Sequence, residues 1–361
     1  MHELAPASDV VALDRSSARA RMFSLVQREI STLILIALAI ACALLSRDFF
    51  TRNNLLNLAD QIPVFAILAA GQMLVILTGG IDLSVGSVLA VGAFFAAAMS
   101  YHGLGPAIVV PLLVTTGIGA INGCGAAFTR VPPFITTLAM LSIARGAALQ
   151  GAAIYHGSAV TAGGASPVSA SREGGFPLLS EGRVFGLPAS FAIAVVVFAV
   201  LAYVLRFTRF GRHVFAVGGN ESAALLLGVR VPTVKLAVYA ISGFLAGLAG
   251  ILYASRQLSA PPTAAQGYEL DAITAVVVGG TLLTGGVGTV RGTIVGLLIV
   301  RILPNVFNLL ALDPAWQQVA RGGVLIAVVL LQLAFVPRGP SQGMKLRRDS
   351  VTEAKPQPTS A

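Results

Sequence analysis

The hydrophobic residues of this chain fall into long uninterrupted runs separated by short polar segments, without the alternation typical of strands. A run of about 20 apolar residues is long enough to cross a bilayer as a helix. Because the bilayer admits only helices or closed barrels, the pattern predicts an all-α polytopic membrane protein with about ten transmembrane helices. The expected spans are 30–45, 59–78, 81–99, 105–127, 134–155, 188–207, 232–254, 268–283, 289–310 and 315–336.

The segments around these spans divide the chain into three parts. Residues 1–29 are predicted to form a polar arm, 30–336 the transmembrane domain and 337–361 a disordered tail. Two connections are long: an outer loop at 156–187, rich in Gly, Ser and Ala, and an inner loop at 206–235.

The basic residues are distributed unevenly between the two sides of the predicted bundle. Of the 24 Lys and Arg residues, 16 lie in the segments on the side of the N-terminus, five on the other side and three within spans. Cytoplasmic loops carry such an excess, so both termini are expected on the cytoplasmic side of the membrane. The net charge of +9 thus indicates topology rather than binding to nucleic acid.

Composition and motifs argue against an enzyme. Hydrophobic residues make up 56% of the chain and charged residues only 11%. No lysine follows a glycine, so the phosphate-binding motif G-x4-G-K-[ST] does not occur. The histidines lie outside the spans, and the two cysteines show no metal-binding spacing. We expect this chain to bind no cofactor and no metal.

A polar break, TGGIDLSVGS at 78–87, interrupts this hydrophobic pattern. Gly79 and Gly80 can end a helix, and Asp82 or Ser84 can cap the next one. The break is either a tight turn at the membrane surface or a broken helix along a transport pathway. If the pathway interpretation holds, Asp82→Ala should leave insertion intact and impair transport.

A similar motif recurs 206 residues later. The pattern T-G-G-[IV]-x4-G-[ST] is found again at 284–293, where it includes Gly285 and Gly286. The apolar stretches 64–78 and 272–283 before the two glycine pairs are only about 22 and 18 Å long as helices, against about 30 Å of hydrocarbon. Short spans at corresponding positions favour a pathway.

Several polar side chains lie inside predicted spans. Arg145 falls near the middle of the fifth span and needs either a pathway role or a structural partner such as a backbone carbonyl. Arg301 has no assignable partner, and Arg321 is expected to snorkel. Gln72 and Asn122 can either bridge helices or meet the hydroxyls of a transported solute.

Five segments resemble the membrane permease subunits of ribose-type bacterial ABC importers. They are GQMLVILTGGIDLSVGS (71–87), INGCGAAFTRVPPFITTLAMLSIARG (121–146), GRHVFAVGGNESAALLLGVRV (211–231), ISGFLAGLAGILYASR (241–256) and VVGGTLLTGGVGTVRGTIVG (278–296). The resemblance runs from about residue 30 to 337 and implies the ten-helix fold of the larger importer class. It also implies a homodimer, two ATPase subunits that bind ATP and Mg²⁺, and a periplasmic sugar-binding protein.

The inner loop contains the segment where this family places its coupling helix. Asn220 is a good N-cap, Glu221 favours the first turn, and Gly228 can close a helix of about two turns. Ala223 and Ala224 would allow close approach to a partner; the alternative is a helix packed only on its own bundle. The residues that match the coupling segment are Arg212, Gly218, Asn220, Glu221, Ala223, Ala224 and Gly228.

The expected function is sugar permeation driven by ATP hydrolysis in the partner chains. A secondary transporter driven by an ion gradient is the alternative, and an intramembrane enzyme lacks a supporting set of residues. Phe134 either stacks on a sugar ring or anchors the start of its span. The expected pathway residues are Gln72, Gly79, Gly80, Asp82, Ser84, Asn122, Phe134, Arg145, Gly285 and Gly286.

Overall fold

The computed structural model describes residues 31–157, 164–313, 315–319, 322–323 and 326. The predicted arm at 1–29, the tail at 337–361 and Arg321 lie outside these residues, as does most of the predicted tenth span. Within the described part, the protein is almost entirely helical, with four two-residue strands.

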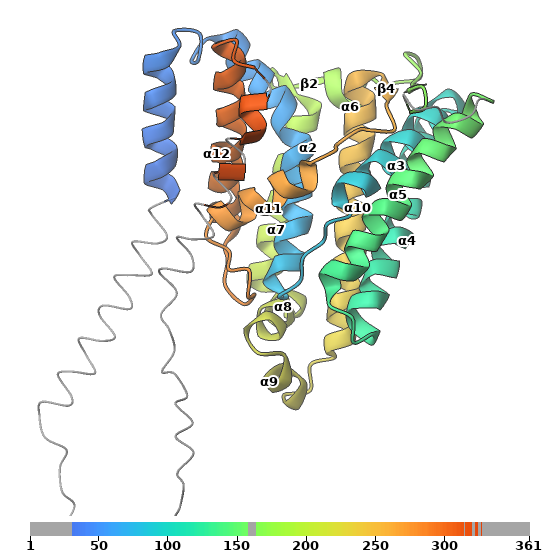
Figure 1. Cartoon of the computed structure of the whole chain (residues 1–361), viewed down its shortest axis with the longest axis vertical. Helices are drawn as coiled ribbons and strands as arrows, with labels where there is room; N and C mark the ends of the chain where they lie inside the picture. The colour runs from blue at the N-terminus through green and yellow to red at the C-terminus, as the bar shows by residue number, and fades with distance from the viewer. Residues whose placement is uncertain (1–30, 158–163, 314, 320–321, 324–325, 327–361) are drawn as a thin grey trace, which may run out of the picture.

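The helices form one bundle, from which two short helices project at one end (Figure 1). The first described helix is Ser31–Leu45. It is followed by α2 (Arg52–Leu77), α3 (Val85–Met99), η1 (Ser100–His102), α4 (Leu104–Phe128), α5 (Pro133–Tyr155), α6 (Leu178–Glu181), α7 (Ala189–Phe207), α8 (Arg209–Gly219), α9 (Glu221–Leu226), α10 (Val231–Gln257), α11 (Tyr268–Val278) and α12 (Val290–Leu309). Seven helices in the described ranges are long and apolar enough to cross a membrane: α2, α3 continued by η1, α4, α5, α7, α10 and α12.

Helix α10 lies at the centre of one half of the bundle and packs against α2, α3 and α4. Small residues allow the close approach: a Cβ on Gly243 would lie 2.8 Å from the Cα of Gly119, and a Cβ on Gly92 would lie 3.1 Å from the Cα of Gly247. Lipid tails are as apolar as the side chains, so the hydrophobic effect does not drive helices together in a membrane. Close packing of small residues does so instead. The α3–α4–α10 contacts therefore provide a rigid support for the segment before α3.

At the end of the bundle opposite α9, the outer loop folds onto the helices (Figure 1). Strand β1 (Val168–Ser169) pairs antiparallel with β4 (Ser259–Ala260), and β2 (Arg183–Val184) pairs with β3 (Leu187–Pro188). Phe176 is 1% exposed, and the Ser255 hydroxyl donates to its carbonyl at 2.8 Å. This loop is packed into the bundle end rather than being a simple connector.

Helix α2 corrects the predicted second span. It begins at Arg52 rather than near residue 59 and has 26 residues, which is about 39 Å. Thr51 caps it, and Asn54 bonds to Asn305 of α12 at 3.1 Å, so the polar residues of this first part are accommodated. The helix before the first glycine pair is therefore longer than the apolar stretch 64–78, and the expectation of a short span there is wrong, because the polar flank at 52–63 is helical as well.

Helix α11 is shorter than the predicted eighth span. The predicted span at 268–283 contains a helix of only 11 residues, about 16 Å long. The chain after it is irregular as far as Thr289, which caps α12 by accepting a hydrogen bond from the Gly292 N–H at 3.0 Å. The short stretch before the second glycine pair is thus confirmed, and it does not cross the membrane as one helix.

Candidate functional site

The first polar break is a turn followed by an extended segment inside the protein. Helix α2 ends at Leu77, and the exposed Gly79 turns the chain with φ +78°, a conformation that glycine adopts without strain. Residues 79–84 form no helix, and Figure 1 shows the chain running back from the end of α2 to the start of α3. Irregular backbone of this kind is tolerated at membrane depth only where protein or water surrounds it.

Asp82 is the centre of the hydrogen bonds that hold this extended segment. It is 2% exposed. One carboxylate oxygen accepts from the Ser84 N–H at 2.9 Å and from the Ser84 hydroxyl at 2.7 Å. The other oxygen accepts from the Ser242 hydroxyl of α10 at 3.2 Å. Both oxygens of the carboxylate are therefore used within the protein.

Two amides and one threonine extend this network to the neighbouring helices. With its amide oriented to match its neighbours, Gln72 donates to the Asp82 carbonyl at 3.1 Å and accepts from the Asp82 N–H at 3.2 Å. Asn122 donates to the Ser84 hydroxyl at 2.8 Å. Thr137 of α5 accepts from the Leu83 N–H at 3.2 Å. The predicted residues Gln72, Asp82, Ser84 and Asn122 thus lie together, and in this structure both amides bridge elements of the bundle.

The two glycine pairs of the repeated motif meet at one point. The Gly286 N–H donates to the Leu77 carbonyl at 3.0 Å, which joins the second turn directly to the last residue of α2. Gly285 has φ +87°, and a Cβ on it would lie 2.7 Å from the Gly79 nitrogen. No sequence signal placed these turns, which are more than 200 residues apart, in contact.

A third glycine pair, at the end of α8, completes what we call the glycine junction: Gly79, Gly80, Gly218, Gly219, Gly285 and Gly286. A Cβ on Gly218 would overlap the Leu77 carbonyl and lie 2.5 Å from the Gly286 nitrogen. A Cβ on Gly286 would lie 2.7 Å from the Gly219 Cα. At Gly218, Gly285 and Gly286 a side chain would collide with neighbouring backbone, so α8 is in direct backbone contact with both turns.

Helix α9 forms where the sequence predicts it. The Asn220 side chain accepts from the Ala223 N–H at 2.9 Å, and Gly228 follows the helix with φ +81°. The Lys235 ammonium of α10 contacts both carboxylate oxygens of Glu221 at 2.8 Å. Ala224 is buried against the chain's own core, whereas Ala223 is exposed.

The outer surface of α9 and its C-cap is apolar. Leu225, Leu226 and Leu227 project from it, and Leu226 is 89% exposed. Figure 1 shows α9 at the tip of the molecule, beyond the ends of the long helices. Three adjacent exposed leucines at a protein tip indicate a contact surface.

Helix α8 was missed in the sequence, although a signal for it exists. Phe210, Val214 and Val217 recur at helical spacing, and Val214 and Val217 are buried. Thr208 caps the helix by accepting from the Gly211 N–H at 3.2 Å. The predicted coupling residues Arg212 and Gly218 lie on α8, and Arg212 is exposed.

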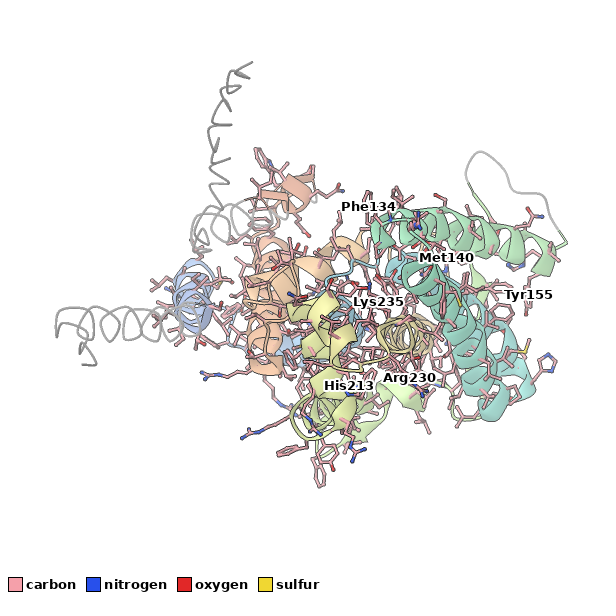
Figure 2. The ribbon with its side chains drawn as sticks, turned by 90° about the horizontal axis from the view of Figure 1, so that it is seen from below. Phe134, Met140, Tyr155, His213, Arg230 and Lys235 are labelled. Atoms are coloured by element: carbon pink, nitrogen blue, oxygen red, sulfur yellow. The ribbon has the colours of Figure 1, made fainter. Side chains whose placement is uncertain are left out.

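The remaining predicted site residues lie away from the Asp82 network. Arg145 donates to the carbonyls of Pro262 and Ala264 at 2.9 and 2.8 Å. Of the two roles considered for Arg145, these bonds favour a structural one, with backbone carbonyls as partners. Phe134 is 48% exposed. Figure 2, seen from the α9 end, places Phe134 at the edge of the bundle and Lys235 near its middle.

Arg301 has the partner that the sequence did not reveal. Its guanidinium lies 3.9 Å from the Asp271 carboxylate and 3.6 Å from the centre of the Phe65 ring. The Asp271 side chain is buried, at 2% exposed. This ion pair joins the short helix α11 to α12.

Comparison with known proteins now identifies the class. Residues 54–329 match the family described as "Branched-chain amino acid transport system / permease component", and the chain belongs to this family of membrane permeases. It is 43% identical to the ribose import permease protein of Escherichia coli K12 over 84% of this chain and 91% of that protein. It is 42% identical to the ribose import permease protein of Haemophilus influenzae over 83% and 90%.

A more distant relative also matches over most of both chains. The L-arabinose ABC transporter permease protein of Azospirillum brasilense is 33% identical over 88% of this chain and 91% of its own length. No solved structure matches the chain. The family and the apolar helices together define a multi-pass membrane protein that serves as a transport subunit.

Proposed function

We propose that this protein is the inner-membrane permease subunit of an ATP-driven importer for a monosaccharide or related polyol of the ribose type. The family description names amino acids, but the relatives that match over most of their length at 42–43% identity are ribose permeases. Retention of this identity along almost the whole chain favours a sugar as the substrate.

The proposed assembly has further parts. Two copies of this chain would form the pathway, with two ATPase subunits on the cytoplasmic side and a sugar-binding protein outside. We further propose that this chain has about ten transmembrane helices and both termini in the cytoplasm, and that it binds no cofactor. With the excess of basic residues facing the cytoplasm, α8 and α9 would lie on the ATPase side, which supports this arrangement.

The observation that carries the proposal is the connection from an exposed apolar tip to both glycine turns. The leucines of α9 offer a docking surface, Glu221 links α9 to α10 through Lys235, and α8 ends in the glycine junction. A movement imposed on α9 by an ATPase would therefore reach both turns through the backbone of α8, which directly precedes α9. Such a connection would couple the ATPase to the pathway in alternating access.

The test is co-purification with an ABC-type ATPase from the same organism, followed by ATP hydrolysis and uptake of labelled D-ribose in lipid vesicles. Leu226→Asp should abolish ATPase binding because it places a carboxylate in an apolar contact. Phe185→Asp is the matched control: Phe185 is also fully exposed, but it lies between β2 and β3 at the opposite end, so this variant should bind normally. Uptake by the permease alone on an imposed ion gradient would instead establish a secondary transporter.

A further inference from the structure

A polar cavity lies beside the glycine junction at the α9 end of the bundle. Its volume is about 370 Å³, which falls within the range of about 300–1,000 Å³ typical of small-molecule sites. The ends of α2 and α8, at residues 78–80 and 217–219, border it, together with Thr284 beside the second turn. The side chains that line it include Thr78, Asn220, Glu221, Lys235, Tyr239 and Thr284.

Tyr239 is the side chain that indicates a ligand. It is 1% exposed, and its hydroxyl has no hydrogen-bond partner among the described residues. The hydroxyl lies over Gly80, where a Cβ would come within 2.5 Å of its oxygen. Buried hydroxyls are normally bonded, so a ligand hydroxyl entering this cavity would meet a donor already in place.

The charge of the lining defines the ligand class. Lys235 and Glu221 are paired at 2.8 Å, so the lining offers no unbalanced charge to a cation or an anion. Thr78 donates its hydroxyl hydrogen to the Val75 carbonyl at 2.8 Å, which leaves its oxygen as an acceptor. A mixture of hydroxyl donors and acceptors without net charge suits a neutral polyhydroxylated molecule.

We propose that this cavity binds a neutral monosaccharide or polyol, with the Tyr239 hydroxyl as a direct hydrogen-bonding group. The proposal rests on the proposed function and adds a site to it: the last position of the sugar before release on the ATPase side. Because the glycine junction borders the cavity, a sugar there would contact the segments that α8 is proposed to move.

The test is protection from a thiol reagent in the full-length permease in nanodiscs, with D-ribose as the probe. In a Cys124→Ser background, Thr284→Cys places the reporter in the cavity wall and Leu226→Cys places a control on α9 outside it. D-Ribose should slow maleimide labelling of Thr284→Cys severalfold and leave Leu226→Cys unchanged. Ribose 5-phosphate, which is charged, should protect far less.

Tyr239→Phe then tests the assigned group. Loss of one hydrogen bond to the sugar should raise the half-protecting D-ribose concentration about tenfold. Ser190→Ala is the matched control, because Ser190 is also buried with no hydrogen-bond partner in the described part of the chain but does not line the cavity. It should leave protection unchanged.

Two results would overturn the site: no protection by D-ribose at the highest concentration that the nanodiscs tolerate, or equal effects of Tyr239→Phe and Ser190→Ala. Either result with normal ATPase association would leave the importer intact and remove only the cavity. Failure of the ATPase to associate would count against the importer, whatever the labelling showed.

Discussion

After α2, the chain turns at Gly79 and Gly80 and enters an irregular segment that is held by hydroxyls and amides around one aspartate. Before the corresponding turn at Gly285 and Gly286, the chain forms the short helix α11, which is held to α12 by an ion pair. The turns share a sequence motif and touch one another, yet their surroundings use different chemistry. The shared glycines therefore serve the contact between the turns, and each half of the bundle stabilises its own irregular segment separately.

Breaking the Arg301–Asp271 pair should give the largest effect, because it is the buried charged contact of the second region. Arg301→Met leaves the Asp271 carboxylate, which is 2% exposed, without its cation and should cost about 3–5 kcal/mol. The thermal melting of the permease in nanodiscs measures this loss.

The double variant Arg301→Met/Asp271→Asn sharpens the interpretation. It removes both charges, so it should recover a large part of the stability that the single variant loses. If the double variant is less stable than the single one, the contribution of Arg301 lies in its packing on Phe65 rather than in its charge.

Disruption of the glycine junction should come next. In Gly218→Ala, the new methyl group overlaps the Leu77 carbonyl and approaches Gly286. Overpacking of this kind costs about 1–3 kcal/mol, and here it forces apart the backbones that connect α8 to both turns. We expect ATP hydrolysis that no longer drives uptake, measured on the same vesicles.

Gly219→Ala is the matched control for this variant. A Cβ at Gly219 meets nothing within 4 Å, and alanine favours the helix slightly. Stability and coupled uptake should stay near normal. Equal loss in both variants would show that the glycines act through chain flexibility rather than through close contact.

The Asp82 network of the first region should be less costly to disturb, because the Asp82 carboxylate is held by hydroxyl and backbone donors rather than by a buried cation. Asp82→Ala removes the acceptor of the Ser84 and Ser242 hydroxyls and should destabilise the protein by about 1–3 kcal/mol. Asp82→Asn keeps one acceptor oxygen. If uptake survives in Asp82→Asn and fails in Asp82→Ala, the segment needs the geometry of the network and not the charge.

The sequence predicted the helical class, most span positions and the local form of α9, because these depend on hydrophobic runs and on capping residues such as Asn220. The sequence did not predict helix boundaries that depend on tertiary contacts. Helix α2 continues through a polar first part because Asn54 finds Asn305 on α12. Such a partner, 251 residues away, leaves no signal in the local pattern.

The candidate site was predictable to a similar degree. The motif at 78–87 identified Asp82 and Ser84 as unusual, and inspection of the spans identified Gln72 and Asn122 as polar. Their assembly into one network depends on how α2, α3, α4 and α10 pack. The glycine junction could not be predicted either, because it also depends on how the helices pack. In a chain with 39 glycines, only the fold shows which of them approach another backbone.

The smallest effect is expected for Asn122→Ala, which separates the two roles that the sequence left open for this residue. Asn122 makes one side-chain hydrogen bond among the described residues, to the Ser84 hydroxyl, and Ser84 keeps its bond to Asp82. Hydrogen bonds between membrane helices contribute about 0.6 kcal/mol on average, so the melting temperature should fall only slightly and ribose uptake should stay near normal. A large rise in the KM of uptake without a change in melting would instead assign Asn122 to the sugar pathway, and the Asp82 network would then be the wall of that pathway rather than only a support for the extended segment.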